Sequence, residues 1–309
     1  YYPITMQAST VAELLVEAFE SLGGKVICDV DVRKIVRDAG RNSFILNGEK
    51  QKKIPLEKAG KKKQAFQTVA ESFSLSADAV ILAAGGKASP KLGSDGSGYR
   101  LARSFGHSLI NPLPALCGIN CKEDYFKELS GVRIQAKVDL LVEGKKHASD
   151  TGELQLTEYG ISGIPVFQVS RYAARALDHG KKVEAVLTFH PEIEDSVKKD
   201  FLNRNKEINK RGFYPDKLLK VLERISPGNL LKPLKVTCLS MQDFDRAQVT
   251  TGGIPVREVN PVTLESKLCR GLYLCGELLD VDGICGGYNL QWAWSSGYVA
   301  AKSAAGDLL

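Results

Sequence analysis

A glycine-rich turn near the C-terminus carries the strongest chemical signal in the sequence. Gly286 and Gly287 lie between a short apolar stretch, 272–275, and a segment, 288–298, whose apolar residues recur at close to helical spacing. Glycine lets a phosphate or a flat ring approach the main chain, and the unpaired N–H groups at a helix start favour an anion. We therefore predict a ligand site here. The residues expected to present backbone groups to it are Gly286, Gly287, Tyr288 and Asn289.

Acidic residues precede this turn. Gly276 and Glu277 end the apolar stretch, and Asp280 and Asp282 lie in the loop that follows. Carboxylates accept hydrogen bonds from hydroxyl groups. Glu277 and Asp282 are therefore candidates for binding ribose or ribityl hydroxyls, with Gly276 beside them.

The whole stretch 271–297 reads GLYLCGELLDVDGICGGYNLQWAWSSG and resembles the C-terminal flavin motif of the HI0933-like (YhiN-type) FAD-dependent oxidoreductases. Further stretches agree with that family at 2–11, 79–107, 157–163 and 249–267. The resemblance implies an α/β fold with an FAD/NAD(P)-binding domain of the glutathione-reductase type. It also implies an enzyme in which FAD carries out hydride or two-electron transfer, with NAD(P)H as an expected electron donor.

Members of that family begin with a strand, a GxGxxG turn and a helix, and the sequence starts at Tyr1 beyond the matching point. The stretch GSDGSG at 93–98 has similar spacing, but it does not directly follow a strand as that fingerprint requires. We therefore expect the chain to be a C-terminal portion of a larger flavoprotein. Such a portion alone is expected to bind FAD weakly, because the missing turn normally holds the pyrophosphate.

Two further places are expected to contact the cofactor. The apolar run Asp78–Ala84 predicts a strand buried on both faces, and Ala84, Gly85 and Gly86 end it where a Cβ would obstruct an approaching dinucleotide. The alternative is an ordinary turn after a central strand. Val32, in a β-branched stretch, matches a position from which the family contacts adenine through the backbone; the alternative is a buried strand valine.

The prolines at 112 and 114 predict an interruption of regular structure and a crossing between domains. We expect a discontinuous FAD-binding domain at 1–112 and 249–309. An inserted α+β domain at 113–248 would be strand-rich over 113–190 and helical over 191–248. Inside it, alternating residues predict a hairpin from 133–142, and Pro165 suits the first turn of a helix.

The catalytic residue is left open by the sequence. Relatives read Thr-His-x-Gly-Leu-Ser-Gly-Pro where this chain has Glu158 in place of the histidine and Ile164 in place of the proline. Glu158 is therefore the candidate for proton transfer. The four histidines are scattered without metal-ligand spacing, so no metal site is predicted.

Composition narrows the setting. The net charge of +6 comes largely from the lysine-rich run 49–63, which we interpret as an exposed hairpin tip because it has no interleaved aromatic residues. No signal peptide or membrane-length apolar run is present, and the seven cysteines form no CxxC pair. We expect a cytoplasmic protein with reduced thiols that acts on a small molecule, without a nucleic-acid or membrane partner; its oligomeric state is open.

Three alternatives stay open for the activity. The flavin could relay electrons from NAD(P)H to an organic acceptor, or an oxidase could pass them to oxygen. An accessory role in nucleic-acid binding or tRNA modification is suggested by the pI of 8.8 alone. The basic residues of the sequence are scattered rather than gathered on one face, which counts against a nucleic-acid-binding role.

Overall fold

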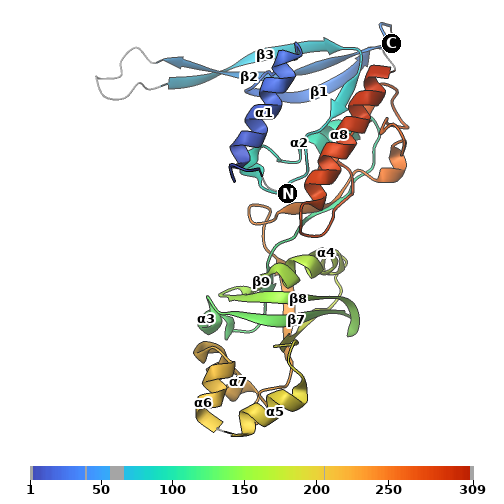
Figure 1. The fold of residues 1–309 in the computed structure, drawn as a ribbon. Coiled ribbons are helices and arrows are strands. Elements are labelled where there is room, and N and C mark those ends of the chain that lie inside the picture. The colour runs from blue at the N-terminus through green and yellow to red at the C-terminus, as the bar shows by residue number, and fades with distance from the viewer. Residues whose placement is uncertain (1–2, 39, 56–65, 205, 307–309) are drawn as a thin grey trace. The chain divides into compact units, whose positions relative to one another are not determined.

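The computed structural model describes residues 3–38, 40–55, 66–204 and 206–306. The chain folds into two units, Tyr1–Asp78 and Ala79–Leu309 (Figure 1).

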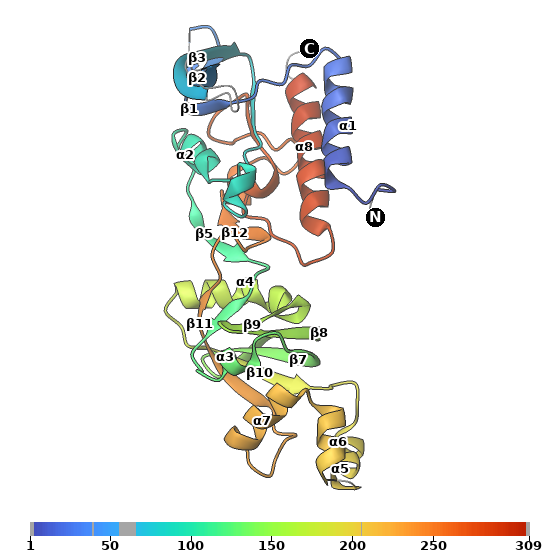
Figure 2. The same ribbon diagram turned by 90° about the vertical axis from the view of Figure 1, so that its left-hand side faces the viewer.

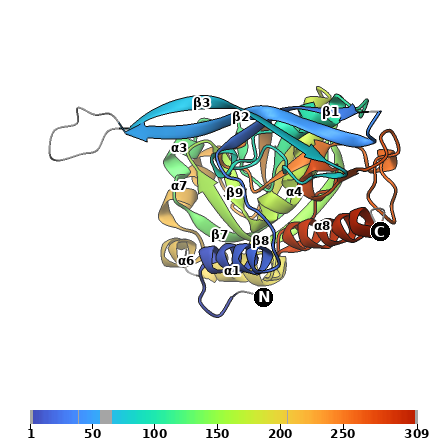
Figure 3. The same cartoon turned by 90° about the horizontal axis from the view of Figure 1, so that it is seen from above.

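The first unit is a helix followed by a three-stranded antiparallel sheet in the order β1-β2-β3 (Figure 3). Its elements are α1 (Ala8–Ser21), β1 (Val30–Asp38), β2 (Ser43–Pro55) and β3 (Phe66–Ala77). A bulge interrupts β1 after Val32, which pairs with Gly48; a Cβ on Gly48 would lie 2.0 Å from the Asp31 carbonyl oxygen. The lysine-rich run extends β2 as far as Pro55, and positions 56–63 of it lie outside the described residues.

The second unit contains the remaining strands and helices. Its strands are β4 (Val80–Leu82), β5 (Ile110–Ala115), β6 (Ile119–Cys121), β7 (Arg133–Val142), β8 (Lys145–Thr157), β9 (Gly160–Gly163), β10 (Val183–Phe189), β11 (Leu234–Met241), β12 (Val249–Gly253) and β13 (Leu272–Leu274). Its helices are η1 (Pro90–Leu92), α2 (Ser97–Arg103), α3 (Phe126–Leu129), α4 (Ile164–Asp178), α5 (Asp195–Arg204), α6 (Lys206–Phe213), α7 (Asp216–Ile225), η2 (Val256–Glu258), η3 (Gly276–Leu278) and α8 (Tyr288–Gly306).

Six strands of this unit close into an antiparallel barrel in the order β10-β11-β6-β9-β8-β7. Alternation along β7 places Ile134, Ala136, Val138 and Leu140 inside, as the period-two pattern predicts. Helices α3, α4 and α7 add apolar residues to the same core, among them Val169 and Leu218. The predicted hairpin and the helix with Pro165 in its first turn are both confirmed.

β4 and β13 pair in parallel, with Leu272 opposite Val80 and Leu274 opposite Leu82. Segments almost two hundred positions apart in the sequence thus share one sheet. The expectation that β4 is buried on both faces is wrong for Ile81, which is 37% exposed between the buried Val80 and Leu82. The molecule therefore combines a mixed α/β structure with an antiparallel barrel.

Strands β5 and β12 connect the barrel with the segment that carries α2 and α8 (Figure 2). The expectation that the prolines at 112 and 114 interrupt regular structure is wrong, because both lie within β5. In the described part of the chain β5 pairs with β12 alone, so prolines without an N–H are tolerated at an edge position. They do lie on the connection to the barrel.

A buried histidine ties three loops of this unit together. His107 is 3% exposed, and its Nε2 lies 2.8 Å from Ser266 Oγ while its Nδ1 lies 2.9 Å from Glu258 Oε2. Ser266 Oγ already accepts the N–H groups of Leu268 and Cys269. Its own proton must therefore go to Nε2, which leaves His107 to donate from Nδ1 to Glu258. The residue is a structural clamp.

Replacing His107 by alanine is expected to lower the free energy of unfolding by about 2 kcal/mol, because a cavity forms and Ser266 loses its acceptor. Urea denaturation measures the loss. His179→Ala, at an exposed position after α4, is the control and should change stability little. Equal stability of the two variants would contradict the clamp.

Candidate functional site

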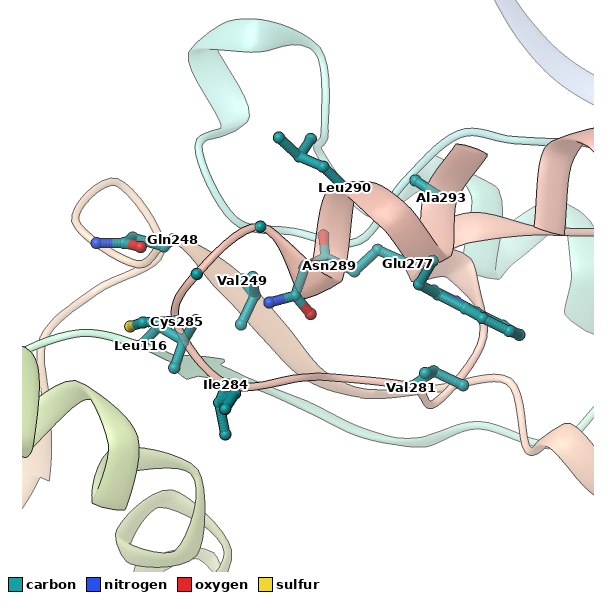
Figure 4. A pocket seen from close by; sticks show the side chains of 13 residues that line it. Leu116, Gln248, Val249, Glu277, Val281, Ile284, Cys285, Asn289, Leu290 and Ala293 are labelled. Atoms are coloured by element: carbon teal, nitrogen blue, oxygen red, sulfur yellow. The ribbon is translucent and has the colours of Figure 1, made fainter. Parts of the chain in front are cut away.

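A cavity of about 340 Å³ opens beside the start of α8 (Figure 4). Val281, Ile284 and Cys285 lie along the loop that closes one side of it. The full lining is Leu116, Gln248, Val249, Glu277, Val281, Ile284, Cys285, Gly286, Gly287, Asn289, Leu290, Trp292 and Ala293. Most of these residues are apolar, and none is a lysine or arginine. The volume falls within the range of about 300–1,000 Å³ typical of small-molecule sites.

The Gly286–Gly287 turn forms the mouth of this cavity. Both residues have positive φ, 120° and 89°, a backbone conformation that residues with a Cβ rarely adopt. No heavy atom lies within 4 Å of the position that a Cβ on Gly287 would occupy. α8 begins at the next residue, Tyr288, whose side chain is exposed. The turn therefore presents bare main chain and a helix start to open space.

Asn289 holds the loop that leads into this turn. Its Oδ1 accepts the N–H of Gly283 at 2.7 Å, and its Nδ2 donates to the Gly283 carbonyl oxygen at 3.2 Å. Both ends of the amide are thus engaged within the chain. Asn289 shapes the site by fixing the loop, which the sequence did not indicate.

Gly276 is pinned to α8 by both of its backbone groups. Its N–H donates to Ser296 Oγ at 2.9 Å, and its carbonyl oxygen accepts from Trp292 Nε1 at 3.0 Å. Its N–H is therefore already used within the protein. This contact sets η3, and hence Glu277, against the start of α8.

Glu277 lies at the centre of a buried polar network. Its Oε1 accepts the N–H of Thr250 at 2.7 Å, and Thr250 Oγ1 in turn accepts the N–H groups of Lys87 and Ala88 at 2.8 and 3.0 Å. Burial raises the pKa of Glu277, although hydrogen bonds from the Thr250 and Gly86 backbones oppose that effect. The carboxylate therefore joins η3, β12 and the segment after β4.

The glycines after β4 serve this packing. A Cβ on Gly86 would lie 2.5 Å from Thr250 Oγ1 and 2.8 Å from Glu277 Oε2, and one on Gly85 would lie 2.8 Å from Ser94 Oγ. Ala84 is exposed beside them and lies against the position of a Cβ on Gly98. The structure thus supplies a reason for these glycines within the chain itself, in addition to the expected approach of a cofactor.

The two loop aspartates pair with arginines of the barrel helix α4. Arg175 Nη2 lies 3.0 Å from Asp280 Oδ1, and Arg171 Nη1 donates to the main-chain oxygen of Asp282 at 2.9 Å. Arg171 Nε also lies 3.1 Å from Asp282 Oδ2, but this contact lacks hydrogen-bond geometry and we treat it as an ion pair. These four residues line a second cavity, of about 460 Å³.

The Asp282 carboxyl is a buried titratable group in this region. Burial raises its pKa, and the charge of Arg171 and the hydroxyl of Thr251 oppose the rise. In the described residues its Oδ2 is a buried acceptor without a hydrogen-bond donor. Its contact with Arg171 is therefore electrostatic rather than a hydrogen bond.

Two predicted residues lie elsewhere. Val32 belongs to the first unit, in β1, and is half-buried there. Glu158 is exposed in the turn between β8 and β9, and it is not among the residues that line either cavity. In the described residues, no group of three or more His, Cys, Asp or Glu side chains could hold a metal ion.

Sequence reasoning missed the arginines of α4 and Gln168, whose Oε1 accepts the Cys285 N–H at 3.1 Å. The one available signal was the four-residue spacing of Arg171 and Arg175, which puts both on one face of the helix. Their partners lie more than a hundred positions away, so no local pattern connects them.

The cavity thus lies at the start of a helix in a unit that also contains the parallel strand pair β4 and β13. Over residues 1–303 the sequence matches the family described as HI0933-like protein Rossmann domain, and the chain belongs to that family.

Curated relatives span nearly the whole chain. A 3-dehydro-bile acid delta(4,6)-reductase of Clostridium scindens is 42% identical in sequence over an alignment that covers 98% of this chain and 75% of that protein. A ribosomal RNA dihydrouridine synthase of Haemophilus influenzae is 28% identical over 96% of this chain and 78% of its own length. The Escherichia coli enzyme of the same name is 26% identical over 90% of this chain and 74% of its own length. The relatives are thus oxidoreductases. Among the described residues, no helix is both long and apolar enough to span a membrane.

Proposed function

We propose that the protein is an FAD-dependent reductase of a small, largely apolar molecule, with NADH or NADPH as its electron donor. The observation that carries the proposal is the cavity that opens on the Gly286–Gly287 turn at the start of α8. Bare main chain suits the close approach of a flat ring, and a helix N-terminus favours negative charge on the group that faces it. When bound, the flavin supplies two-electron chemistry; the chain binds, orients and shields it.

The residues proposed to hold the cofactor divide by position. The turn Gly286–Asn289 would contact the isoalloxazine ring. The segment after β4, with Ala84, Gly85 and Gly86, would also contact the cofactor, and Gly276 and Glu277 would lie beside it. Asp282, which lines the second cavity, would take a ribityl or sugar hydroxyl. Val32 is proposed to contact adenine through its backbone. Glu158 stays a proposal for proton transfer, although its exposed position gives it no support.

We also propose the domain arrangement that places these residues. The FAD-binding domain would comprise 1–112 and 249–309, and 113–248 would be an inserted domain. The insert would contribute α4 and the barrel to substrate binding. The pairings β4–β13 and β5–β12 support it, because each joins segments on opposite sides of the insert.

The lining of the cavity favours one substrate class. The relative at 42% identity is named for a 3-dehydro-bile acid, and those at 28% and 26% are named for ribosomal RNA. Apolar lining residues such as Val281, Ile284 and Leu290 suit the fused apolar rings of a steroid-like substrate beside the flavin. Reduction of a carbon–carbon double bond in a small apolar substrate is therefore the activity we propose.

An absorbance spectrum of the purified full-length protein, followed by anaerobic titration with NADH and NADPH, tests the cofactor and its donor. Incubation with a 3-oxo bile acid carrying 4,6 double bonds should then give a product heavier by two hydrogens. Modification of ribosomal RNA from a dihydrouridine-deficient strain would support the second candidate instead. Rapid oxygen consumption without either substrate would indicate an oxidase.

Replacing Gly287 by valine is expected to weaken FAD binding at least tenfold, a loss of about 1.4 kcal/mol or more. A β-branched side chain cannot easily adopt a φ of 89°, and it would fill the open space at the turn. Quenching of flavin fluorescence measures the affinity. Gly297→Val is the matched control, because Gly297 lies within the same helix and also has no atom within 4 Å of its added Cβ. Equal affinities would place the flavin elsewhere.

A further inference from the structure

Two cysteines lie directly opposite each other in the barrel. Cys121 ends β6, and the register of the antiparallel pair sets it against Cys238 of β11. The next residue, Lys122, donates its N–H to the Thr237 carbonyl oxygen at 3.0 Å. The Cys121 N–H points away from β11 and donates to the Tyr159 carbonyl oxygen at 2.8 Å. Cys121 and Cys238 are therefore a non-hydrogen-bonded pair, the closer of the two kinds of cross-strand pair, with Cα atoms about 4.5 Å apart.

The two side chains also share one environment. Cys238 is 3% exposed in the barrel core, and the half-buried Cys121 packs against that core. The Cys121 thiol donates to the Ile119 carbonyl oxygen at 3.8 Å, and the neighbouring Cys238 side chain helps to raise its pKa. A disulfide requires Cα atoms about 4.4–6.8 Å apart and side chains on the same face. The register of β6 and β11 therefore brings the pair within the range that a disulfide requires.

We propose that Cys121 and Cys238 are a redox-modification site, at which a low-molecular-weight disulfide such as oxidised glutathione forms a reversible cross-strand disulfide. Cys121 attacks first, because Cys238 is buried behind it. The Cys121 sulfur bonds to one glutathione sulfur, and the other leaves as a thiolate that takes up a proton. Cys238 then attacks the Cys121 sulfur and releases the second glutathione. Two cysteine thiols are oxidised, and one glutathione disulfide is reduced to two thiols.

The bond would join the first barrel strand along the chain, β6, to the last, β11. β6 follows β5 and β11 precedes β12, so the disulfide encloses the chain from 122 to 237. Closing so long a loop restricts the unfolded state, and the melting temperature of the oxidised protein should rise by on the order of 10 °C. The cross-link would also fix the strands that connect the barrel to the cavity residues Leu116 and Gln248.

The surroundings make the reaction slow at neutral pH. The neighbouring Cys238 side chain and burial both raise the pKa of Cys121, and the Glu123 carboxylate adds to the rise. Only the thiolate attacks a disulfide. Formation of the bond should therefore accelerate as the pH rises through the alkaline range, and the disulfide once formed should persist.

The test is incubation of the full chain in native buffer at mildly alkaline pH with oxidised glutathione, followed by alkylation of free thiols and peptide mass mapping. A peptide pair joined through Cys121 and Cys238, released by dithiothreitol, is the expected result. Cys121→Ala and Cys238→Ala should each abolish it, and Cys28→Ala, at an exposed position, should not. Failure to form this link, its appearance only in urea, or pairing through other cysteines would each overturn the proposal. The melting temperature before and after dithiothreitol gives an independent readout.

Discussion

Replacement of Glu277 by alanine is expected to lower the free energy of unfolding by about 3 to 4 kcal/mol. The Thr250 N–H, in a residue that is 1% exposed, would lose its acceptor, and a buried donor without a partner costs about 1–3 kcal/mol. The Gly86 backbone would lose a second interaction with the same carboxylate. A cavity would form where the side chain stood.

The effect should extend to the cofactor site. Thr250 holds the segment after β4 through the Lys87 and Ala88 N–H groups, so a displaced Thr250 releases that segment as well. Flavin affinity of the full-length variant should fall together with its stability. Urea denaturation measures the first quantity and flavin fluorescence the second.

Glu277→Gln separates the hydrogen bond from the charge. Glutamine keeps the acceptor for Thr250 without burying a charge, so its stability at neutral pH should lie within about 1 kcal/mol of wild type. Because the folded-state pKa of Glu277 is raised above its ordinary value of 4.5, its contribution is fully present below that value and is lost as the pH rises through the folded pKa. The glutamine variant should lack this loss. A wild-type pH profile in E277Q would show that another group is responsible.

Replacement of Arg171 by methionine is expected to cost about 3 kcal/mol, because it leaves the Asp282 carboxylate buried without its cation. The Asp282 side chain is 7% exposed, and Arg171 also donates to its main-chain oxygen. Removing one member of a buried pair usually costs more than the pair contributes. The loss should shrink as the pH falls, since the already raised pKa of Asp282 would rise further and the neutral acid needs no partner.

The double variant R171M/D282N provides the internal check. It removes the stranded charge and should recover more than half of the loss measured by urea denaturation. Arg133→Met serves as the control, because Arg133 and Glu153 form an ion pair that is more than half exposed and should contribute less than about 1 kcal/mol. An R171M variant as stable as the control would show that α4 is held by its apolar contacts alone.

Local signals in the sequence were sufficient for several elements. The alternation over 133–142 and the proline in the first turn of α4 each depend on residues within one element. The glycines at 286 and 287 likewise indicated a turn that residues with a Cβ rarely adopt, and the structure places that turn at the start of α8 beside a cavity. Backbone preference and side-chain period are local properties, so the sequence displays them directly.

The contacts that assemble the site were decided by the tertiary structure. Glu277 binds Thr250, and the α4 arginines bind Asp280 and Asp282, across separations of 27 to 111 positions. The glycines after β4 are predicted either to approach a cofactor or to form an ordinary turn, and the structure shows that Thr250, Glu277 and Ser94 occupy the space a Cβ would need. The prolines expected to interrupt regular structure lie in β5. In the described residues this strand pairs with β12 alone, so a proline without an N–H can be accommodated on its unpaired side.

The sequence by itself therefore determined local features: the glycine turn at 286 and 287, the helix start after it and the acidic residues before it. Only the tertiary structure decided which hydrogen-bond partners the groups around that turn have within the chain. Glu277, Gly276 and Asn289 had been expected to face a cofactor, and each makes hydrogen bonds within the protein. The reason is that a polar group's partner is set by the packing of distant segments, which no local pattern encodes.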